Sequence, residues 1–456
     1  MNLIRPVARF IFIIFLLTVP SRLYGAVLSS APLTLDDAVR IGIQKSRALE
    51  IARLDRDMAG QKIRETWSEV LPQISASSSY TRSLKSSILF FPESVFNPGA
   101  ASTSFRSIPV SSDNAARASI DLRQTLFDWS AFAGIKAASI VRKMSEEAYR
   151  GAEANVVADI KIAYFDALIS KEQLTLIEQS MARWEQSRKD TRAMFRQGVV
   201  ADIDTLKAWL SVENLRPELM QAENRVATSM TRLKNVMGIP VESSVVLGGK
   251  LEITSASYPA DVVTAYREAI DSRPELRQLD YQVQAEGEKV NAARAEHFPI
   301  LSAFGKLESQ TAFNDGTSYS DAKWPASSAV GLQLTMPLFT GFRISAKVEQ
   351  ARIGQLQTRT RYDELKSAIR AEIEIRVLNY RESQKRIEVQ SKTISVAERS
   401  YNISRLRFKE GIGSRLELTD AELQLNKAKT NYFQAVYDNL AATVQLEKAL
   451  GRRVAK

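Results

Sequence analysis

The feature that most constrains the fold is residues 338–456, which contain no proline. Because proline interrupts helices more strongly than any other residue, this stretch can form very long helices. In its last part, an apolar position recurs in alternating steps of four and three residues, with one polar exception. These positions are Ala421, Leu425, Ala428, Tyr432, Ala435, Asn439, Ala442, Leu446 and Ala449. A seven-residue repeat of this kind predicts helices that pair in a left-handed coiled coil.

A short turn signal precedes this repeat and predicts a helical hairpin. Gly411 can close the first helix in the left-handed conformation, with Gly413 beside it, and Ser414 can cap the second helix. The same signal occurs 213 residues earlier, where Phe-Arg-Gln-Gly ends at Gly198 and corresponds to the Phe-Lys-Glu-Gly that ends at Gly411. The hairpin is therefore predicted twice.

The coiled-coil positions are duplicated as well. Subtracting 213 from each gives Ala208, Val212, Leu215, Leu219, Ala222, Val226, Ser229, Leu233 and Val236. An offset of 227 aligns the upstream parts and takes Pro72 to Pro299. The first copy is therefore longer, and its extra residues lie between Pro72 and the long helix that follows. We predict a first structural repeat at 26–238, a linker at 239–259 and a second repeat at 260–456.

Residues 1–25 have the pattern of a secretory signal peptide. Arg5 and Arg9 precede an apolar run over 10–19, and small residues follow at Gly25 and Ala26. The alternative is a membrane anchor, but this run is too short to span a bilayer. The chain contains no cysteine, which excludes disulfides, thiolate metal sites and a lipid-modified cysteine. We expect an exported protein whose stability comes from packing alone.

The pattern changes after Pro72 and Pro299, each of which ends a predicted helical segment. Short segments with alternating apolar and polar residues follow and predict a strand, a loop and a strand in each repeat. The alternating positions are Ile74, Ala76, Ser78 and Tyr80, then Ala118, Ile120 and Leu122, and in the second repeat Val330, Leu332, Leu334 and Met336. A serine-rich, proline-containing loop is predicted at 81–115, and Pro337 marks the return from strand to helix.

Strands of about ten residues with one apolar face have the length and alternation of transmembrane β-strands. An ordinary half-buried sheet is the alternative for any single strand. The predicted export, the four matched strands and the lack of a globular core favour transmembrane strands over a half-buried sheet. Unpaired backbone groups are costly in a bilayer, so an open four-stranded sheet requires strands from other chains. Since known barrels have roughly eight strands or more, at least two chains are needed, and three would give twelve strands.

Helices without proline are predicted over 126–196 and 339–409, about 105 Å long at 1.5 Å per residue. The return helix of the first repeat contains Arg216-Pro217 and should be kinked there, whereas its counterpart in the second repeat has no proline. Within the linker, we expect a small pair of strands at 245–247 and 251–253.

These features together resemble the TolC-like outer-membrane efflux proteins. The resemblance is carried by Leu71-Pro72, Phe298-Pro299, residues 337–341, 408–411, 416–421 and 446–451. It implies a mixed α and β membrane protein with an internal duplication. In such a homotrimer, four transmembrane strands per chain complete a 12-stranded β-barrel in outer-membrane lipid, and coiled-coil hairpins form an α-barrel across the periplasm. Partners would be a periplasmic adaptor and an inner-membrane pump. Thr125 departs from the family, which often has proline there.

The resemblance also assigns a periplasmic gate. Asp420 and Glu417 match an acidic constriction at the periplasmic tip, and Asp204 is the counterpart of Glu417 in the first repeat. For Glu417 a capping box with Ser414 is an equally good explanation. In the family, a tip tyrosine and a tip arginine can latch neighbouring helices.

The residues at the latch positions here are Phe408 and Gly413, so the family's latch is not present in its usual form. Arg415 is the substitute that the sequence offers.

Other functions are not favoured. The net charge is +10, from 62 basic and 52 acidic residues, but the charges are scattered along helix faces, which argues against a nucleic-acid partner. The sequence has no nucleophile–base pair, phosphate-binding loop or metal-ligand spacing, so we expect no enzyme activity, cofactor or metal. The single histidine, His297, precedes a strand and is interpreted as structural.

The predicted function is a passive duct for small-molecule efflux in a tripartite system. Type I protein secretion and an exported coiled-coil scaffold without a pore are the alternatives.

Overall fold

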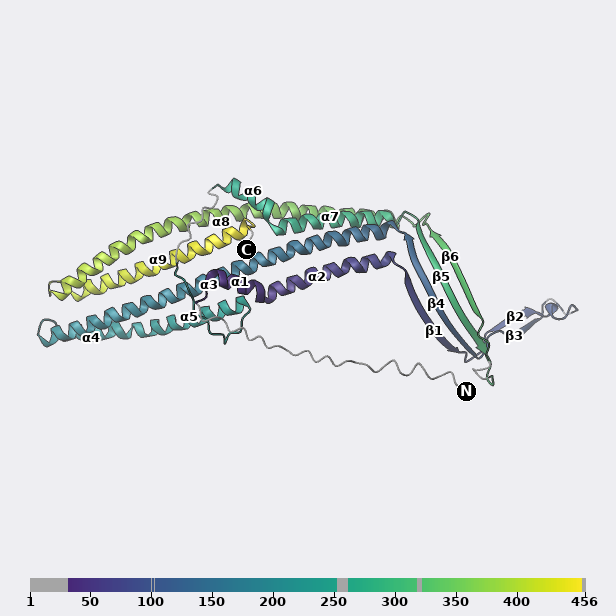
Figure 1. Cartoon of the computed structure of the whole chain (residues 1–456), viewed down its shortest axis with the longest axis horizontal. Helices are drawn as coiled ribbons and strands as arrows, with labels where there is room; N and C mark the ends of the chain where they lie inside the picture. Colours follow the sequence, from purple (N-terminus) through teal and green to yellow (C-terminus); the bar gives the residue numbers. More distant parts are fainter. Residues whose placement is uncertain (1–31, 100, 102, 252–260, 318–321, 453–456) are drawn as a thin grey trace.

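The computed structural model describes residues 32–99, 101, 103–251, 261–317 and 322–452, so the predicted signal peptide at 1–25 lies outside the described residues. The described chain is elongated, with long helices along most of its length and a tilted sheet at one end (Figure 1). The helices are α1 (Leu35–Lys45), α2 (Arg47–Trp67), α3 (Trp129–Arg196), α4 (Asp202–Glu213), α5 (Leu215–Met237), α6 (Val262–Ser272), α7 (Pro274–Ala295), α8 (Arg343–Lys409) and α9 (Arg415–Ala449), with a short 3-10 turn η2 (Ser68–Val70) after α2. The strands are β1 (Gln73–Arg82), β2 (Ile88–Pro92), β3 (Phe105–Pro109), β4 (Asn114–Phe127), β5 (Ile300–Phe313) and β6 (Ala326–Thr335).

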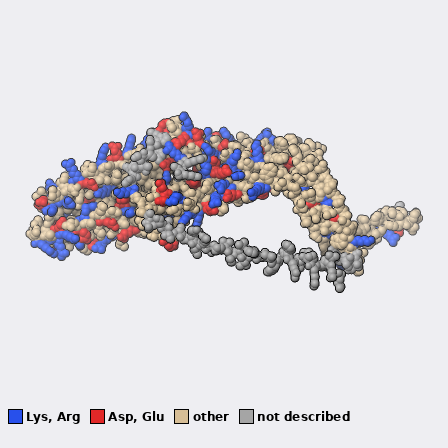
Figure 2. Space-filling view, in the orientation of Figure 1, with Lys and Arg blue, Asp and Glu red and all other residues tan. Residues whose placement is uncertain are grey.

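The main sheet is antiparallel, with strand order β1-β4-β5-β6. Each repeat contributes two of these strands, as the alternating patterns predict. Among the described residues, β1 pairs only with β4 and β6 only with β5, so both edges of the sheet are open. The large apolar side chains of β6, at Val330, Leu332 and Leu334, are exposed on one face. Lys, Arg, Asp and Glu gather on the helices and are sparse on the visible face of the sheet (Figure 2).

The first repeat departs from the prediction in two places. The segment 81–115 is not only a loop, because β2 and β3 pair within it and form a hairpin that extends beyond the far end of the main sheet (Figure 1). The sequence did not indicate β2, because its short apolar run lies among serines, which favour a loop. The long helix also begins later than residue 126, since the carboxylate of Asp128 accepts hydrogen bonds from the backbone N–H of Ser130 and Ala131 and caps α3 there.

The two longest helices, α3 and α8, contain 68 and 67 residues and are about 100 Å long. Helix α9 folds back along α8 as an unbroken helix, whereas the return helix of the first repeat is divided into α4 and α5 at Asn214. This break lies three residues before Pro217. The position follows from proline chemistry, because the ring clashes with the carbonyl of Glu213 and supplies no N–H to it.

Both return helices end on a glycine that packs against a joint between two shorter helices. Gly238 has φ +71°, and a Cβ added there would come within 2.3 Å of the Lys45 carbonyl oxygen at the α1–α2 joint. Gly451 has φ +68°, and a Cβ there would come within 2.9 Å of the Arg273 backbone nitrogen at the α6–α7 joint. The largest buried cluster lies beside Gly238 and includes Ile160, Leu233 and Met237.

The linker differs from the prediction of a strand pair at 245–247 and 251–253. Leu247 forms an isolated parallel bridge with Leu33, whose backbone N–H donates to the Val246 carbonyl at 2.8 Å. Residues 252–253 lie outside the described residues. The linker therefore ties the start of the described chain to the centre of the molecule, where Tyr164 also donates to the Leu33 carbonyl.

Candidate functional site

The two hairpin turns lie side by side at the end of the molecule away from the sheet (Figure 1). Gly198 closes α3 and Gly411 closes α8, both with φ +74°, the left-handed region that glycine adopts without strain. Gly413 has no positive φ, but a Cβ there would come within 2.9 Å of the Arg407 Cβ, so the tight turn requires a small residue.

The three prolines at the helix–strand joins lie outside the helices and strands. Pro72 separates η2 from β1, Pro299 separates α7 from β5, and Pro337 lies between β6 and α8.

Arg415 connects the two hairpins at the tip. It is the first residue of α9 and is buried, with a relative exposure of 9%. Its guanidinium donates to the Thr191 hydroxyl of α3 at 3.1 Å and to the Ser211 hydroxyl of α4 at 3.4 Å. Burial lowers the pKa of Arg415, and the negative charge of Asp204 opposes that change. Among the described contacts at the tip, this one side chain reaches both helices of the other hairpin.

Asp204 lies on the same groove as Arg415. The groove has a volume of about 690 Å³ and is also lined by Ser211, Phe408 and Thr419. Phe408 is buried in the seam between α8 and α9, where it packs with Leu418 and related residues. The structure therefore brings Asp204 and Arg415 together, and the position that carries a tyrosine in the resembled family is an apolar seam residue here.

Glu417 and Asp420 lie apart from this groove. The Glu417 backbone N–H donates to the Ser414 hydroxyl at 3.1 Å, which is one half of a capping box, but the Glu417 carboxylate pairs with Arg407 at 3.6 Å. Both acidic side chains are exposed in the single chain. Asp420 is on the first turns of α9, beyond the cap.

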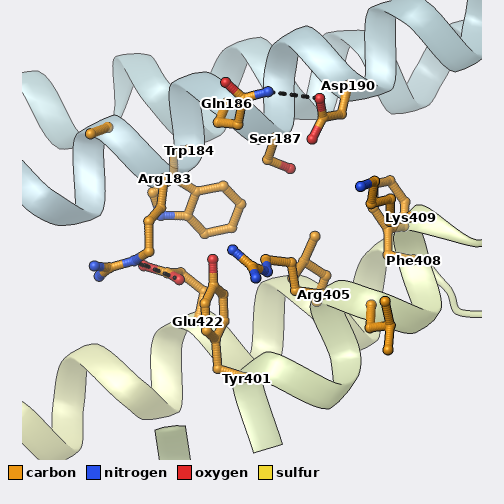
Figure 3. Close-up of a pocket in the computed structure, with 13 residues that line it drawn as sticks. Arg183, Trp184, Gln186, Ser187, Asp190, Tyr401, Arg405, Phe408, Lys409 and Glu422 are labelled. Carbon is orange, nitrogen blue, oxygen red and sulfur yellow. Dashed lines mark hydrogen bonds and ion pairs between the residues drawn. The ribbon is translucent and has the colours of Figure 1, made fainter.

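A buried polar cluster between α3 and α9 was not predicted from the sequence. Glu422 is only 2% exposed, and its carboxylate accepts from Arg183 Nε at 2.8 Å and from the Ser180 hydroxyl at 3.2 Å. The Arg183 Nη2 also donates to the Asn426 side chain at 2.9 Å. Figure 3 shows the Arg183–Glu422 pair beside Tyr401. The one available signal was a glutamate directly after the coiled-coil position Ala421.

The polar exception in the coiled-coil repeat is also satisfied. Asn439 is buried and donates from Nδ2 to the Ser383 hydroxyl of α8 at 2.9 Å. Within the described ranges, no group of three or more His, Cys, Asp or Glu side chains could hold a metal ion. None of the described helices combines the length and apolar character needed to span a bilayer.

The arrangement of duplicated hairpins, open sheet and glycine turns is that of a known family. The model of the outer membrane efflux protein family matches residues 41–239 and 265–452. The chain belongs to the outer membrane efflux protein family. The resemblance drawn from the sequence is confirmed, and with it the outer-membrane location.

Individual relatives have low sequence identity to this chain, but the alignments cover much of its length. Over 333 residues, it is 24% identical to the alkaline protease secretion protein AprF of Pseudomonas aeruginosa, covering 72% of this chain and 68% of that one. It is 23% identical to TtgC, a probable efflux pump outer membrane protein of Pseudomonas putida, over 67% of this chain and 62% of that one. It is 21% identical to the outer membrane protein TolC of Escherichia coli, over 87% and 78%. These relatives are outer-membrane, efflux and secretion proteins, and none of the three names denotes an enzyme.

Solved structures share the fold. The structure of CusC aligns with a TM-score of 0.72 at 18% identity, covering 91% of this chain and 92% of that one. The outer membrane protein VceC of Vibrio cholerae aligns with a TM-score of 0.70 at 16% identity, covering 91% and 96%. The fold is that of outer-membrane efflux channels, largely helical with a four-stranded sheet and a two-stranded hairpin.

Proposed function

We propose that three copies of this chain form a closed duct across the outer membrane and the periplasm. The observation that carries the proposal is the four-stranded sheet with open edges at β1 and β6. In a bilayer these backbone groups require partners, and strands from neighbouring copies supply them without any other chain. Three copies give a barrel of twelve strands, with the exposed apolar side chains of β6 facing outer-membrane lipid.

The cargo of this duct is small molecules, delivered by a periplasmic adaptor and an inner-membrane pump. TtgC is named as part of an efflux pump, and this chain has the same family architecture. Protein secretion is the second candidate, because AprF is named as a protein that serves alkaline protease secretion. The long helices, about 100 Å each, would form the part of the duct that extends into the periplasm.

The tip is proposed as the gate. Arg415 holds the two hairpins of one chain together through Thr191 and Ser211, with Asp204 beside it. Around a threefold axis, Asp420 would form a ring of three carboxylates and Glu417 a second ring. Rings of acidic side chains favour the passage of cations.

Conductance and mass together test the proposed duct. The purified full chain should run as a trimer in native mass spectrometry from detergent and should open discrete channels in planar bilayers. A monomer that inserts stably in outer membranes would contradict the proposed closure of the barrel. A trimer without any conductance would instead support a scaffold without a pore.

The orientation has its own test. The segment with β2 and β3 should lie outside the cell. The protein should tolerate an epitope inserted at Asn97, which is exposed, because little backbone is buried there. Antibody should label intact cells. Labelling only after lysis would reverse the orientation.

A further inference from the structure

A second cavity lies between the two hairpins near the tip and shares Phe408 with the groove around Arg415. It has a volume of about 570 Å³, which is within the range of small-molecule sites. Helix α3 contributes one wall, and α8 with the first turns of α9 contributes the other.

The walls combine aromatic rings with cationic groups. Trp184 and Tyr401 are buried and lie on opposite walls, and Phe408 is a third buried aromatic residue of the lining. Figure 3 shows the side chains of Arg405 and Lys409 reaching from α8 toward the space under α3. An aromatic ring inserted here would therefore meet rings on both sides and a cation at its edge.

The charged side chains that line the cavity are three cations, Arg183, Arg405 and Lys409, and two carboxylates, Asp190 and Glu422. Glu422 is paired with Arg183, and Asp190 keeps its negative charge because its hydrogen-bond donor, the Gln186 side chain at 2.8 Å, is neutral. In contrast, neither Arg405 nor Lys409 makes an ion pair with any described residue. The remaining electrostatic preference of the cavity is therefore for a negative charge.

A buried hydroxyl supplies a second polar contact. Burial raises the pKa of Tyr401, with the charge of Glu422 acting in the same direction, so the phenol is a neutral hydrogen-bond donor.

We propose that this cavity is a binding site for an amphipathic organic anion, namely an aromatic ring that carries a carboxylate. The ring would lie between Trp184 and Tyr401, and the carboxylate would lie between Arg405 and Lys409. Such a ligand contacts α3 and α8 at once. It therefore links the two hairpins at a place where the protein itself leaves a gap.

Three probes with one ring system and different charge test the site on the purified full chain. Indole-3-acetate is an anion, indole-3-acetamide is neutral and tryptamine is a cation. In isothermal titration calorimetry, the anion should bind about tenfold more tightly than the neutral probe, as expected for a charge-assisted contact. The cation should bind most weakly. Equal affinity for the three probes would overturn the proposal and leave only an apolar gap.

Variants then locate the binding. Arg405→Ala and Lys409→Ala should each weaken the anion about tenfold and leave the neutral probe unchanged. Arg399→Ala is the matched control, because Arg399 is an exposed arginine of α8 that does not line the cavity. All three changes remove exposed side chains and should not affect folding. An equal loss in Arg399→Ala, or no loss in Arg405→Ala and Lys409→Ala, would place the anion elsewhere and refute the site.

Discussion

The two repeats share an order of elements but differ in whether the return helix of the hairpin is continuous. In the second repeat, α9 runs unbroken along α8 and carries the buried Glu422, whereas the first repeat has a return helix divided at Asn214. The second repeat therefore has a continuous seam, and the first has a joint in the middle of its return arm. Duplication preserved the coiled-coil positions, while a single proline interrupts the backbone hydrogen bonds of one return helix.

The seam between the hairpins shows a second difference. The Arg183–Glu422 pair joins α3 to α9 within one chain, and the offset of 213 takes these positions to Val396 on α8 and Trp209 on α4. Both counterparts are apolar and exposed in the single chain, at 69% and 49%. If copies assemble so that the second hairpin of one meets the first hairpin of the next, the equivalent seam between chains would be apolar.

Chemical crosslinking tests whether the second hairpin of one copy lies beside the first hairpin of the next. Trp209→Cys and Val396→Cys, introduced together, should be joined between copies by a short bismaleimide, giving a ladder up to three chains on denaturing gels. The chain has no natural cysteine, so the background is clean. The matched control pairs Val396→Cys with Met220→Cys, another exposed residue of the return arm. A ladder in the control alone, or crosslinks only within one chain, would contradict this contact between copies.

The largest stability effect is expected at the glycines that end the return helices. Gly238→Ala should lower the apparent melting temperature strongly, since it combines a left-handed conformation, roughly 1–2 kcal/mol for alanine, with overlap against the Lys45 carbonyl. Gly198→Ala is the control, because Gly198 has φ +74° but an added Cβ would meet no described atom within 4 Å. Circular dichroism melts of both variants compare the two decreases in melting temperature. Equal decreases would show that packing at the α1–α2 joint contributes nothing to stability.

A smaller effect is expected from the buried ion pair. Glu422→Ala leaves Arg183 without its partner and should destabilise the protein by roughly 3 kcal/mol, at the lower end of values for buried pairs because the arginine is partly exposed. Replacing both residues with leucine should recover most of the loss. The control is Glu398→Ala, whose partner Lys429 is at 3.0 Å in a more exposed pair worth about 1 kcal/mol or less. Denaturant titration that gave Glu422→Ala no larger effect than the control would argue against a stabilising pair.

The smallest effect concerns ion selectivity at the tip. Asp420 in the second repeat corresponds to Lys207 in the first, so the two repeats would place opposite charges around the same ring. Asp420→Ala should reduce cation selectivity and raise leak through the closed duct, and Lys207→Ala should increase cation selectivity. Glu417→Ala should mainly loosen the start of α9. Single-channel recordings of Asp420→Ala that match the parent in selectivity and closed-state conductance would rule out Asp420 as the gate.

Local signals in the sequence predicted most of the architecture. The apolar positions from Ala421 to Ala449 and the glycines at 198 and 411 depend only on neighbours along one helix, so the hairpins could be predicted. The alternating strands could be predicted for the same reason. The pairing of Arg183 with Glu422 could not, because it depends on which helix faces α3, and the two residues are 239 positions apart.

Three further features were not predicted, two of them because they depend on contacts between distant parts of the sequence. Leu247 pairs with Leu33, far away in the sequence, and not with the nearby residues of the linker. The β2–β3 hairpin was hidden because its apolar run lies between serines and prolines, which weigh toward a loop in any local window. The position of Arg415 between Thr191 and Ser211 likewise required the hairpins to be placed beside each other.

The two open edges of the sheet have a genetic consequence. Because β1 and β6 are different strands, closure of the proposed ring is head-to-tail, and every copy gives one edge to a neighbour and receives the other. A copy whose β6 cannot pair still occupies a place through β1 and leaves the ring open, although its neighbours are intact. An allele of this kind would be dominant over the native gene, with complete rings falling as the cube of the native share of chains. Raising the dose of the native gene would then restore export only gradually.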